Sequence, residues 1–499
     1  MGTDNAKSRR AALVVLACIL VLAAALRIHR VTERSLWFDE AVSVLIGLSD
    51  AGGALRAADA EKLPPLYNLT LVAFFSGFRG EAAARLLSGL FGLLNVVFVY
   101  LAGRELHGRR AGLVAATLAA AAGFAVWYSQ EIRVYALQSL LVTGSCLWML
   151  RLLRTGSRGD LLVYAAMTAG SLYAQYSSLF VLAFQNLYFF LAWRDNRERL
   201  RIWIAAQALV LLLFSPWIPA FARHLTSRSG SFWLPPLTAK YLLGHFYNFT
   251  GGLQSRGTLN AFFAWTSLAV LILAAAAVLM RRDTRKAGLF ALLWFWVPTA
   301  LLAAVSLGQN IFLSRALLYT LPAFCLLAGL AIGPNLERSL RAAVAALALA
   351  GLLAADASCL VHYYGDPNWW IKPPHRENAR RVAALARDGD LVVHTSRFTY
   401  RPYQFYIGSE VPMCLLRETE DLPGLFAVIG RSDPPKDASG VARIWLVAYA
   451  DFQQKGLHAR VAKWMQQHHR PVRVLYRDRN NFVALLERGD GPLLPEVGP

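Results

Sequence analysis

Charged side chains are scarce in this chain of 499 residues, because Asp, Glu, Lys and Arg together make up only 16% of it. Hydrophobic residues make up 56%, which is too apolar for an ordinary soluble enzyme. Only five cysteines occur, without the spacing of a metal cluster or a disulfide framework. The C-terminal part lacks a GxGxxG or P-loop pattern, so we predict no nucleotide site. The composition indicates a membrane protein.

The formal net charge of +20 would favour a nucleic-acid partner if the charges formed a patch. The Lys and Arg residues instead gather in short segments between apolar runs, which is the distribution that the positive-inside rule describes. We therefore expect membrane lipids as the surroundings of this chain, and no nucleic acid.

Apolar runs long enough to cross a bilayer recur from about Leu13 to Val361. Arg-rich loop ends alternate with charge-poor ones, which places the N-terminus inside and the C-terminus outside. The first run continues into the following loop, which predicts an uncleaved span rather than a removed signal peptide. We predict about 11 transmembrane helices, near residues 11–28, 83–103, 111–128, 133–152, 161–175, 177–193, 202–219, 258–280, 287–305, 316–332 and 342–361.

The apolar segment from Pro64 to Phe78 decides the topology. Its run of about 15 residues is more typical of an interfacial or re-entrant piece than of a span. Counting it as a span would place every later Arg-rich loop outside. We therefore predict outer-face loops at about 29–82 and 220–257. Four charged side chains then face outward together: Asp39, Glu61, Lys62 and Glu131.

From about Asp366 the composition becomes that of a soluble domain. Residues 390–395, 443–448, 472–477 and 482–487 are predicted to be strands, with helices such as 456–469 between them. This alternation predicts a small α/β domain with a largely parallel sheet. We thus expect a transmembrane domain at 1–361 and an extracytoplasmic, periplasmic domain at 362–499.

Five motifs stand in order along the chain. They are Trp37-Phe38-Asp39-Glu40-Ala41, Pro64-Pro65-Leu66-Tyr67, Arg85-Leu86-Leu87-Ser88, Tyr128-Ser129-Gln130-Glu131-Ile132-Arg133-Val134-Tyr135, and the stretch from Arg315 to Pro322. Together they resemble the GT-C glycosyltransferases, within the branch of protein O-mannosyltransferases and lipid A aminoarabinose transferases. The resemblance is strong over about residues 30–140 and weak in the C-terminal domain.

The resemblance implies a GT-C fold and an enzyme of the bacterial cytoplasmic (inner) membrane. Such an enzyme moves a sugar from a polyprenyl-phosphate donor to an acceptor at the outer face, with inversion at the anomeric carbon. The acceptor is a lipid, a glycan or a protein. A lipid-linked donor also suits a compartment without nucleotide sugars.

Asp39 is the predicted general base, because a carboxylate near the donor carbon can take the proton of the acceptor hydroxyl. The alternative is a helix N-cap or a surface ion pair for a helix that begins near Ala41. Glu40 is expected to serve the helix start or a neighbouring Arg, or to orient the acceptor.

We predict cationic contacts to the donor phosphate from Lys62, Arg133 and Arg315, with a hydrogen bond from Tyr319. The resemblance implies the contacts of Lys62 and Tyr319, and the positions of Arg133 and Arg315 allow theirs. If residues 315–322 are α-helical, Arg315 and Tyr319 share one face. Arg85 could serve the phosphate or pair with an acidic loop residue. The alternatives are interfacial ion pairs and a snorkelling Arg beside a core Tyr.

Glu131 is predicted to orient the donor or bind the acceptor, and Tyr128 and Tyr135 make its surroundings polar and aromatic. The resemblance allows a divalent cation of unknown identity, with Glu61 and His245 as candidate ligands. A solvated loop pair and a structural His are the alternatives at those two positions.

Three other functions compete with glycosyl transfer. A lipid or sugar transporter or flippase would place its charges at mid-membrane and often contain an internal repeat, which we do not find. A polysaccharide polymerase or ligase would share the donor but lack these motifs. The C-terminal domain could itself be the functional part, although eleven spans are too many for an anchor.

Overall fold

The computed structural model describes residues 2–226, 234, 236–250, 258–308, 310–336, 339–366, 372–416, 426–427, 443–449, 469–477 and 481–488. The chain forms two compact units. The helical unit contains Met1–Val31 and Ile46–Trp370, and the sheet unit contains Thr32–Leu45 and Ile371–Pro499. The short segment Thr32–Leu45, with Asp39 in it, therefore belongs to the unit formed by the C-terminal part of the chain.

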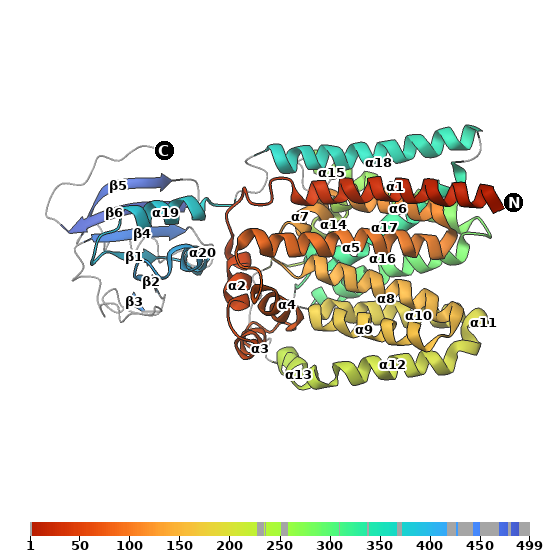
Figure 1. Cartoon of the computed structure of the whole chain (residues 1–499), viewed down its shortest axis with the longest axis horizontal. Helices are drawn as coiled ribbons and strands as arrows, with labels where there is room; N and C mark the ends of the chain where they lie inside the picture. The colour runs from red at the N-terminus through yellow and green to blue at the C-terminus, as the bar shows by residue number, and fades with distance from the viewer. Residues whose placement is uncertain are drawn as a thin grey trace. The chain divides into compact units, whose positions relative to one another are not determined.

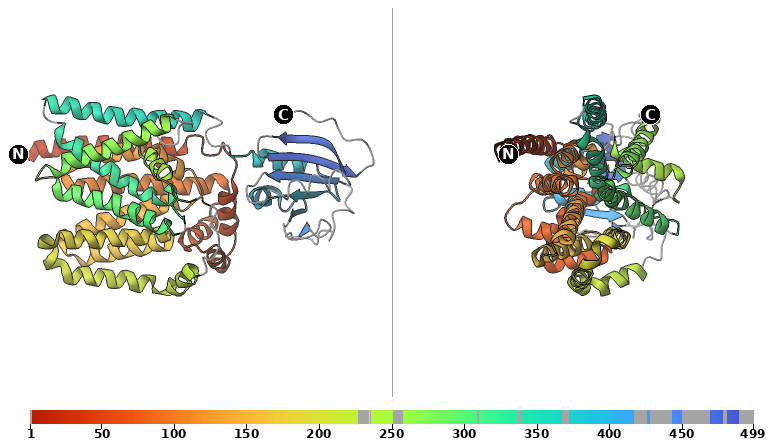
Figure 2. Two further views of the ribbon diagram at one scale, coloured as in Figure 1. Left: turned by 180° about the vertical axis from the view of Figure 1, so that it is seen from behind. Right: turned by 90° about the vertical axis from the view of Figure 1, so that its right-hand side faces the viewer.

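Long apolar helices build the helical unit. Figure 1 shows them side by side, and the right view of Figure 2 looks roughly along them. The helices of this unit are α1 (Gly2–Ile28), α3 (Ala51–Ala60), α4 (Leu66–Phe75), α5 (Glu81–His107), α6 (Arg109–Ala121), α7 (Gly123–Ser129), α8 (Tyr135–Thr155), α9 (Arg158–Ala174), α10 (Leu179–Leu191), α11 (Trp193–Asn196), α12 (Leu200–Phe214), α13 (Ile218–Thr226), α14 (Ala239–Phe246), α15 (Thr258–Leu279), α16 (Arg285–Ser306), α17 (Leu321–Ile332) and α18 (Ser339–Gly365).

All eleven predicted spans fall on helices, but not all of these helices are equally long. Among the described residues, seven helices are long and apolar enough to cross a membrane, or eight if the bent pair α6 and α7 counts as one span. Of the other predicted segments, α9 has 17 residues, the helical stretch of α10 runs over Tyr176–Leu191, and only Trp265–Leu279 of α15 counts as a shorter apolar helix. The protein is thus a multi-span membrane protein, and the count of eleven stays a prediction.

The segment that decided the topology forms α4, which has only ten residues. At 1.5 Å per residue, such a helix is roughly 15 Å long and is too short to cross the apolar core of a bilayer. α3 and α4 pack together at the end of the helical unit away from the N-terminus (Figure 1).

The helix that precedes Glu131 is broken, with a bend of 60° between α6 and α7. The break leaves carbonyls at the end of α6 without helical partners. The Arg27 guanidinium of α1 supplies donors, at 3.1 Å from the Ala120 oxygen and 3.4 Å from the Ala119 oxygen. In return, the Gln130 amide donates to the carbonyls of Arg27 and His29 at the end of α1. Arg27 and Gln130 therefore hold α1 against the break.

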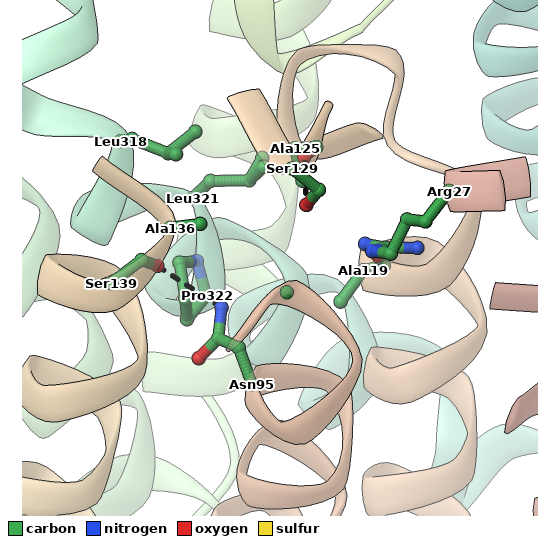
Figure 3. Close-up of a pocket in the computed structure, with 11 residues that line it drawn as sticks. Arg27, Asn95, Ala119, Ala125, Ser129, Ala136, Ser139, Leu318, Leu321 and Pro322 are labelled. Atoms are coloured by element: carbon green, nitrogen blue, oxygen red, sulfur yellow. Dashed lines mark hydrogen bonds between the residues drawn. The ribbon is translucent and has the colours of Figure 1, made fainter. Parts of the chain in front are cut away.

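A small cavity lies beside this break, between Arg27, Asn95, Ser129 and Pro322 (Figure 3). Its volume is about 10 Å³, close to the minimum for one water molecule. A side chain at Gly92 would meet the Ser129 hydroxyl at 2.1 Å. Glycine is therefore needed at position 92 for the close approach of α5 to the Ser129 turn.

Uncharged polar side chains link α8, α9, α10 and α12 inside the helical unit. Gln185 donates to Ser145 at 2.8 Å and accepts from the Tyr164 hydroxyl at 2.8 Å. Ser145 also shares a hydrogen bond of 2.7 Å with Thr168, and Gln207 donates to Tyr164 at 3.0 Å. We refer to these five residues as the polar clasp. Hydrogen bonds of this kind hold helices together in an apolar environment.

The sheet unit contains six strands in the order β3-β2-β1-β4-β6-β5. Its elements are α2 (Phe38–Gly47, whose last two residues belong to the helical unit), α19 (His375–Leu385), β1 (Leu391–His394), α20 (Arg397–Ile407), β2 (Met413–Leu416), β3 (Phe426–Ala427), β4 (Arg443–Tyr449), β5 (His469–Arg477) and β6 (Asn481–Arg488). Val392, Tyr403, Trp445 and Leu485 lie in its apolar core.

The prediction of a largely parallel sheet is wrong. Only the pairs β1–β2 and β1–β4 are parallel, whereas β2–β3, β4–β6 and β5–β6 are antiparallel. Three residues separate β5 from β6, and a connection that short cannot cross over to a parallel strand. The predicted helix at 456–469 lies outside the described residues up to 468, and His469 begins β5.

Candidate active site

Asp39 and Glu40 lie in the first turn of α2, where the helix dipole favours negative charge. Asp39 is half-buried and Glu40 is fully buried. Glu40 accepts from the backbone N–H of Trp37 at 3.4 Å, which is one of the two hydrogen bonds of a capping box. It also pairs with Lys372 at 2.9 Å. Glu40 thus serves the helix start, and its cationic neighbour is a Lys rather than the expected Arg.

Glu131 lies in the connection between α7 and α8, at the centre of a buried aromatic cluster. The Trp127 indole N–H donates to its carboxylate at 2.9 Å, and the side chain is almost fully buried. The Tyr128 hydroxyl shares a hydrogen bond with Arg315. It also interacts electrostatically with Glu131 and Tyr135. The Arg315 guanidinium lies 5.8 Å from the centre of the Tyr135 ring. We refer to these five residues as the Glu131 cluster.

The sequence pattern placed Glu131 and Arg133 at the start of a span, whereas α8 begins only at Tyr135. Arg133 is half-buried in the same connection, and its backbone N–H bonds to the Glu131 carbonyl at 2.8 Å. The structure therefore brings four predicted residues together with Arg315, which comes from a distant part of the chain. These four are Tyr128, Glu131, Arg133 and Tyr135.

Arg315 and Tyr319 do not share one face, contrary to the prediction. They lie in the 3-10 helix η5 (Ser314–Thr320), in which residues four apart point in different directions. Pro322 explains the irregular winding, because it has no N–H to donate to the preceding turn. The Tyr319 hydroxyl donates to the Ser177 carbonyl at 2.9 Å. Its phosphate contact stays a prediction, and would require this hydrogen bond to break.

Arg85 is also engaged within the helical unit. It pairs with Glu81 at 2.9 Å, one turn earlier on α5, and donates to the Val31 carbonyl at 2.9 Å. The side chain is 1% exposed. These contacts match the structural alternative considered for Arg85, namely a pair with an acidic residue.

Lys62 has an uncommon backbone conformation, with a φ of +55°. It follows α3 at the position where a Schellman motif needs the left-handed region, and glycine is the usual residue there. The bonds from Lys62 N–H to Asp59 and from Leu63 N–H to Ala58 complete that motif. A non-glycine residue in this region is strained by about 1–3 kcal/mol, and such strain gathers at functional sites. The strained backbone of a residue with a charged side chain agrees with the predicted function of Lys62.

Near Lys62, a chain of hydrogen bonds that sequence reasoning missed links three segments of the helical unit. His224 bonds to Asp59 at 2.9 Å through one ring nitrogen and to the Tyr176 hydroxyl at 2.7 Å through the other. Arg223 also donates to Asp59 at 3.0 Å. The hydrogen bonds from His224 and Arg223 lower the pKa of the Asp59 carboxyl. This network anchors α3, and with it the turn at Lys62.

The two candidate metal ligands have different surroundings. Glu61 is exposed, whereas His245 is buried among the rings of Phe246, Phe249 and Phe312. Among the described residues, no group of three or more His, Cys, Asp or Glu side chains is arranged to hold a metal ion. Burial lowers the pKa of the His245 imidazole to about 3, so it is neutral at pH 7. The cation and its two candidate ligands stay predictions.

Two further residues of these sites were missed by sequence reasoning. Trp127 stands four positions before Glu131, a spacing that could have indicated the contact. Lys372 is a single cation after an aromatic stretch, which is a weak indication of function. Its pairing with Glu40 could not be predicted from spacing, because the two residues are 332 positions apart.

Comparison with known proteins agrees with this architecture. The described fold is similar to ArnT from Cupriavidus metallidurans in the apo state (TM-score 0.58, 15% identity, 95% of this chain and 98% of that one). ArnT from the same organism bound to undecaprenyl phosphate gives a TM-score of 0.56 at 15% identity, with 95% and 97% coverage. The Archaeoglobus fulgidus oligosaccharyltransferase tethered with an acceptor peptide gives 0.53 at 12% identity, with 95% and 74% coverage.

These similarities define the class of protein as a multi-span membrane protein with a GT-C-type fold. Residues 62–219 match the family model of dolichyl-phosphate-mannose-protein mannosyltransferases. No curated protein matches the chain by sequence. The chain is therefore similar to the GT-C membrane glycosyltransferases in fold and, over residues 62–219, in sequence.

Proposed function

We propose that this protein is an inverting glycosyltransferase that moves a sugar from a polyprenyl-phosphate donor to an acceptor at the outer face of the membrane. The observation that supports it most is the Glu131 cluster, in which a buried carboxylate, an Arg and two Tyr side chains gather within a GT-C fold. A buried carboxylate beside a guanidinium is costly in an apolar environment, so it is usually kept for a function.

In this proposal the donor phosphate is bound by cations. Arg315 and Arg133 are the main candidates, with Lys62 as the third. Charge-assisted hydrogen bonds from such groups stabilise the negative charge that develops on the leaving phosphate. The similarity to ArnT bound to undecaprenyl phosphate supports a carrier of this chemical class.

Asp39 acts in this proposal as the general base. It takes the proton of the acceptor hydroxyl while the acceptor oxygen forms a bond to the anomeric carbon from the side opposite the phosphate. The bond between that carbon and the phosphate oxygen breaks, and the polyprenyl phosphate leaves with the electron pair. The half-buried position of Asp39 in the first turn of α2 supports this role, because the carboxylate keeps access to solvent.

The variant Asp39→Asn tests the base. It keeps size and hydrogen-bonding geometry but cannot accept the proton, so transfer should fall about 10²- to 10⁴-fold. Sugar transfer from undecaprenyl-phosphate-linked sugars of the host and binding of undecaprenyl phosphate are measured side by side on protein purified in detergent. Binding should stay unchanged, because no phosphate contact is assigned to Asp39.

Asp50 offers a matched control for this experiment. It caps α3 by accepting from the Gly53 N–H, and Asn caps helices about as well as Asp. Asp50→Asn should therefore leave transfer nearly unchanged. Near-normal transfer by Asp39→Asn would remove Asp39 as the base. Mass spectrometry of surface glycans from cells with and without the gene would identify the transferred sugar.

A lipid transporter is the second candidate, because transporters often contain broken helices, and α6 and α7 form one. In transporters the ends of such helices face the ligand, whereas here Arg27 satisfies the carbonyls at the break. Two results together would favour the transporter. The Asp39→Asn variant would move labelled polyprenyl phosphate across vesicle membranes, and the wild type would show no sugar transfer.

A further inference from the structure

The segment that carries Asp39 is fixed by the sheet unit over several consecutive residues. The Arg376 guanidinium donates to the carbonyl of Thr32 at 2.9 Å and to that of Arg34 at 3.1 Å. The Ser35 hydroxyl donates to Glu377 at 3.2 Å. Arg376 and Glu377 both belong to α19, so this helix holds the beginning of the segment.

The next residues of the segment contact α20. The Leu36 N–H donates to the Tyr406 hydroxyl at 2.9 Å, and Leu36 is fully buried. The Phe38 ring lies 4.8 Å from that of Phe398, between ring centres. The Arg397 guanidinium lies 5.4 Å from the centre of the Phe38 ring. The residue immediately before Asp39 is therefore held by packing against the start of α20.

The residue immediately after Asp39 is held by an ion pair. The side chains of Glu40 and Lys372 are 0% and 5% exposed, and their charged atoms lie 2.9 Å apart. The Lys372 ammonium also lies 6.0 Å from the centre of the Trp37 ring. A buried pair of this kind defines one geometry, because either charge would be left without compensation if the other moved away.

Asp39 stands between these two fixed neighbours. Successive side chains of an α-helix point about 100° apart, so burial of Glu40 against the sheet unit leaves Asp39 directed elsewhere. Its partial exposure agrees with this. The direction of the Asp39 carboxylate is thus set by how firmly Phe38 and Glu40 are held.

We propose that Lys372 is a positioning residue for Asp39, and that one role of the C-terminal domain is to hold the first turn of α2 in its working orientation through the Lys372–Glu40 pair. This inference rests on the proposed function. It assigns Lys372 to orientation of the base and not to donor binding. A misplacement of about 1 Å at a reacting group can reduce the rate about 10²-fold.

The test compares Lys372→Met with Lys372→Arg in the purified full-length protein. Lys372→Met should lower kcat at least tenfold, with unchanged KM for the donor and unchanged affinity for undecaprenyl phosphate. Lys372→Arg keeps the positive charge and should restore most of kcat. Lys286→Met is the matched control, because Lys286 pairs with Asp195 at 2.8 Å but is exposed. It should leave kcat unchanged.

The double variant Glu40→Gln/Lys372→Met covers the case in which the single variant does not fold, because it leaves no buried charge without a partner. If the pair positions Asp39, the double variant should lose about as much kcat as Lys372→Met alone. Normal kcat in the folded single or double variant would overturn the positioning role, while an inactive Asp39→Asn would leave the proposed function standing. Normal transfer by Asp39→Asn would instead contradict the base itself.

Discussion

Two groups of buried polar side chains in the helical unit differ in charge. The polar clasp is uncharged, and its side chains donate and accept among themselves. The Glu131 cluster contains a carboxylate and a guanidinium within an aromatic surrounding. Both groups are polar and lie mostly buried in the helical unit, so polarity and burial alone do not distinguish structure from function.

The difference follows from the energetics of burial. An uncharged group loses little when it exchanges water for another hydrogen-bond partner, whereas an ion loses several kcal/mol of hydration. A neutral network can therefore be kept for helix packing alone. The charged cluster lies at the opposite end of α8 from Arg154, which pairs with Glu105. Arg154 forms an exposed ion pair, which is typical of a solvated loop end, whereas Glu131 is buried.

Between these two groups, the largest effect on transfer is expected from removal of the Arg315 charge. Arg315→Met should reduce transfer about 10²- to 10³-fold, the loss typical for one donor to a developing anion, with little change in melting temperature. The same measurement on Arg133→Met tests the second cation. Arg154→Met, at the exposed pair with Glu105, is the control and should transfer normally. Normal transfer by both Arg315→Met and Arg133→Met would remove the phosphate assignment.

The opposite result is expected in the polar clasp. Gln185→Leu leaves Tyr164 and Ser145 without one partner each, so the free energy of unfolding should fall by about 1–3 kcal/mol. The transfer rate per folded molecule should stay the same. Thermal unfolding in detergent and single-turnover transfer measure the two quantities. A fall in rate as large as that of Arg315→Met would break the distinction between the two groups.

His245 is a third kind of buried polar group, because neither ring nitrogen has a hydrogen-bond partner among the described residues. Its pKa is about 3 in the folded state, below the usual 6.5, so the unfolded state binds more protons between these values. Stability from this group is fully present above pH 6.5 and is lost as pH falls toward 3, by about 1.4 kcal/mol per pH unit.

The variant His245→Phe should flatten this pH dependence and unfold no more readily than the wild type at pH 7. Unfolding curves at pH 7 and pH 5 measure it. Loss of stability of the wild type on addition of a chelator, absent in His245→Phe, would instead restore the predicted metal role of His245.

The smallest effect on stability is expected at Lys62. Lys62→Gly relieves the left-handed strain and should stabilise the protein by up to about 1 kcal/mol, whereas Lys62→Ala keeps the strain. Both variants remove the cation and should weaken donor use about tenfold, the value of one charge-assisted contact. If Lys62→Gly gains stability and transfers normally, Lys62 has no part in the site.

Much of the helical unit follows from the sequence alone. Bilayer thickness sets the length of an apolar run, so all eleven predicted spans fall on helices, and the short run after Pro64 forms only the ten-residue α4. The order of the motifs was enough to suggest the GT-C class, because each motif is a short continuous stretch of sequence. The stretches around Glu131 and Arg315 are two of them.

Only the tertiary structure decided which distant residues meet. Arg315 lies next to Tyr128 and Tyr135, Gln130 caps α1, and Lys372 pairs with Glu40 across 332 positions. Periodicity in the sequence indicates which residues are neighbours within one helix or strand. It gives no information on contacts between different elements. The short connection between β5 and β6 could have indicated their antiparallel pairing, but the order of the strands in the sheet and the affiliation of Asp39 with that unit depend on contacts between distant elements.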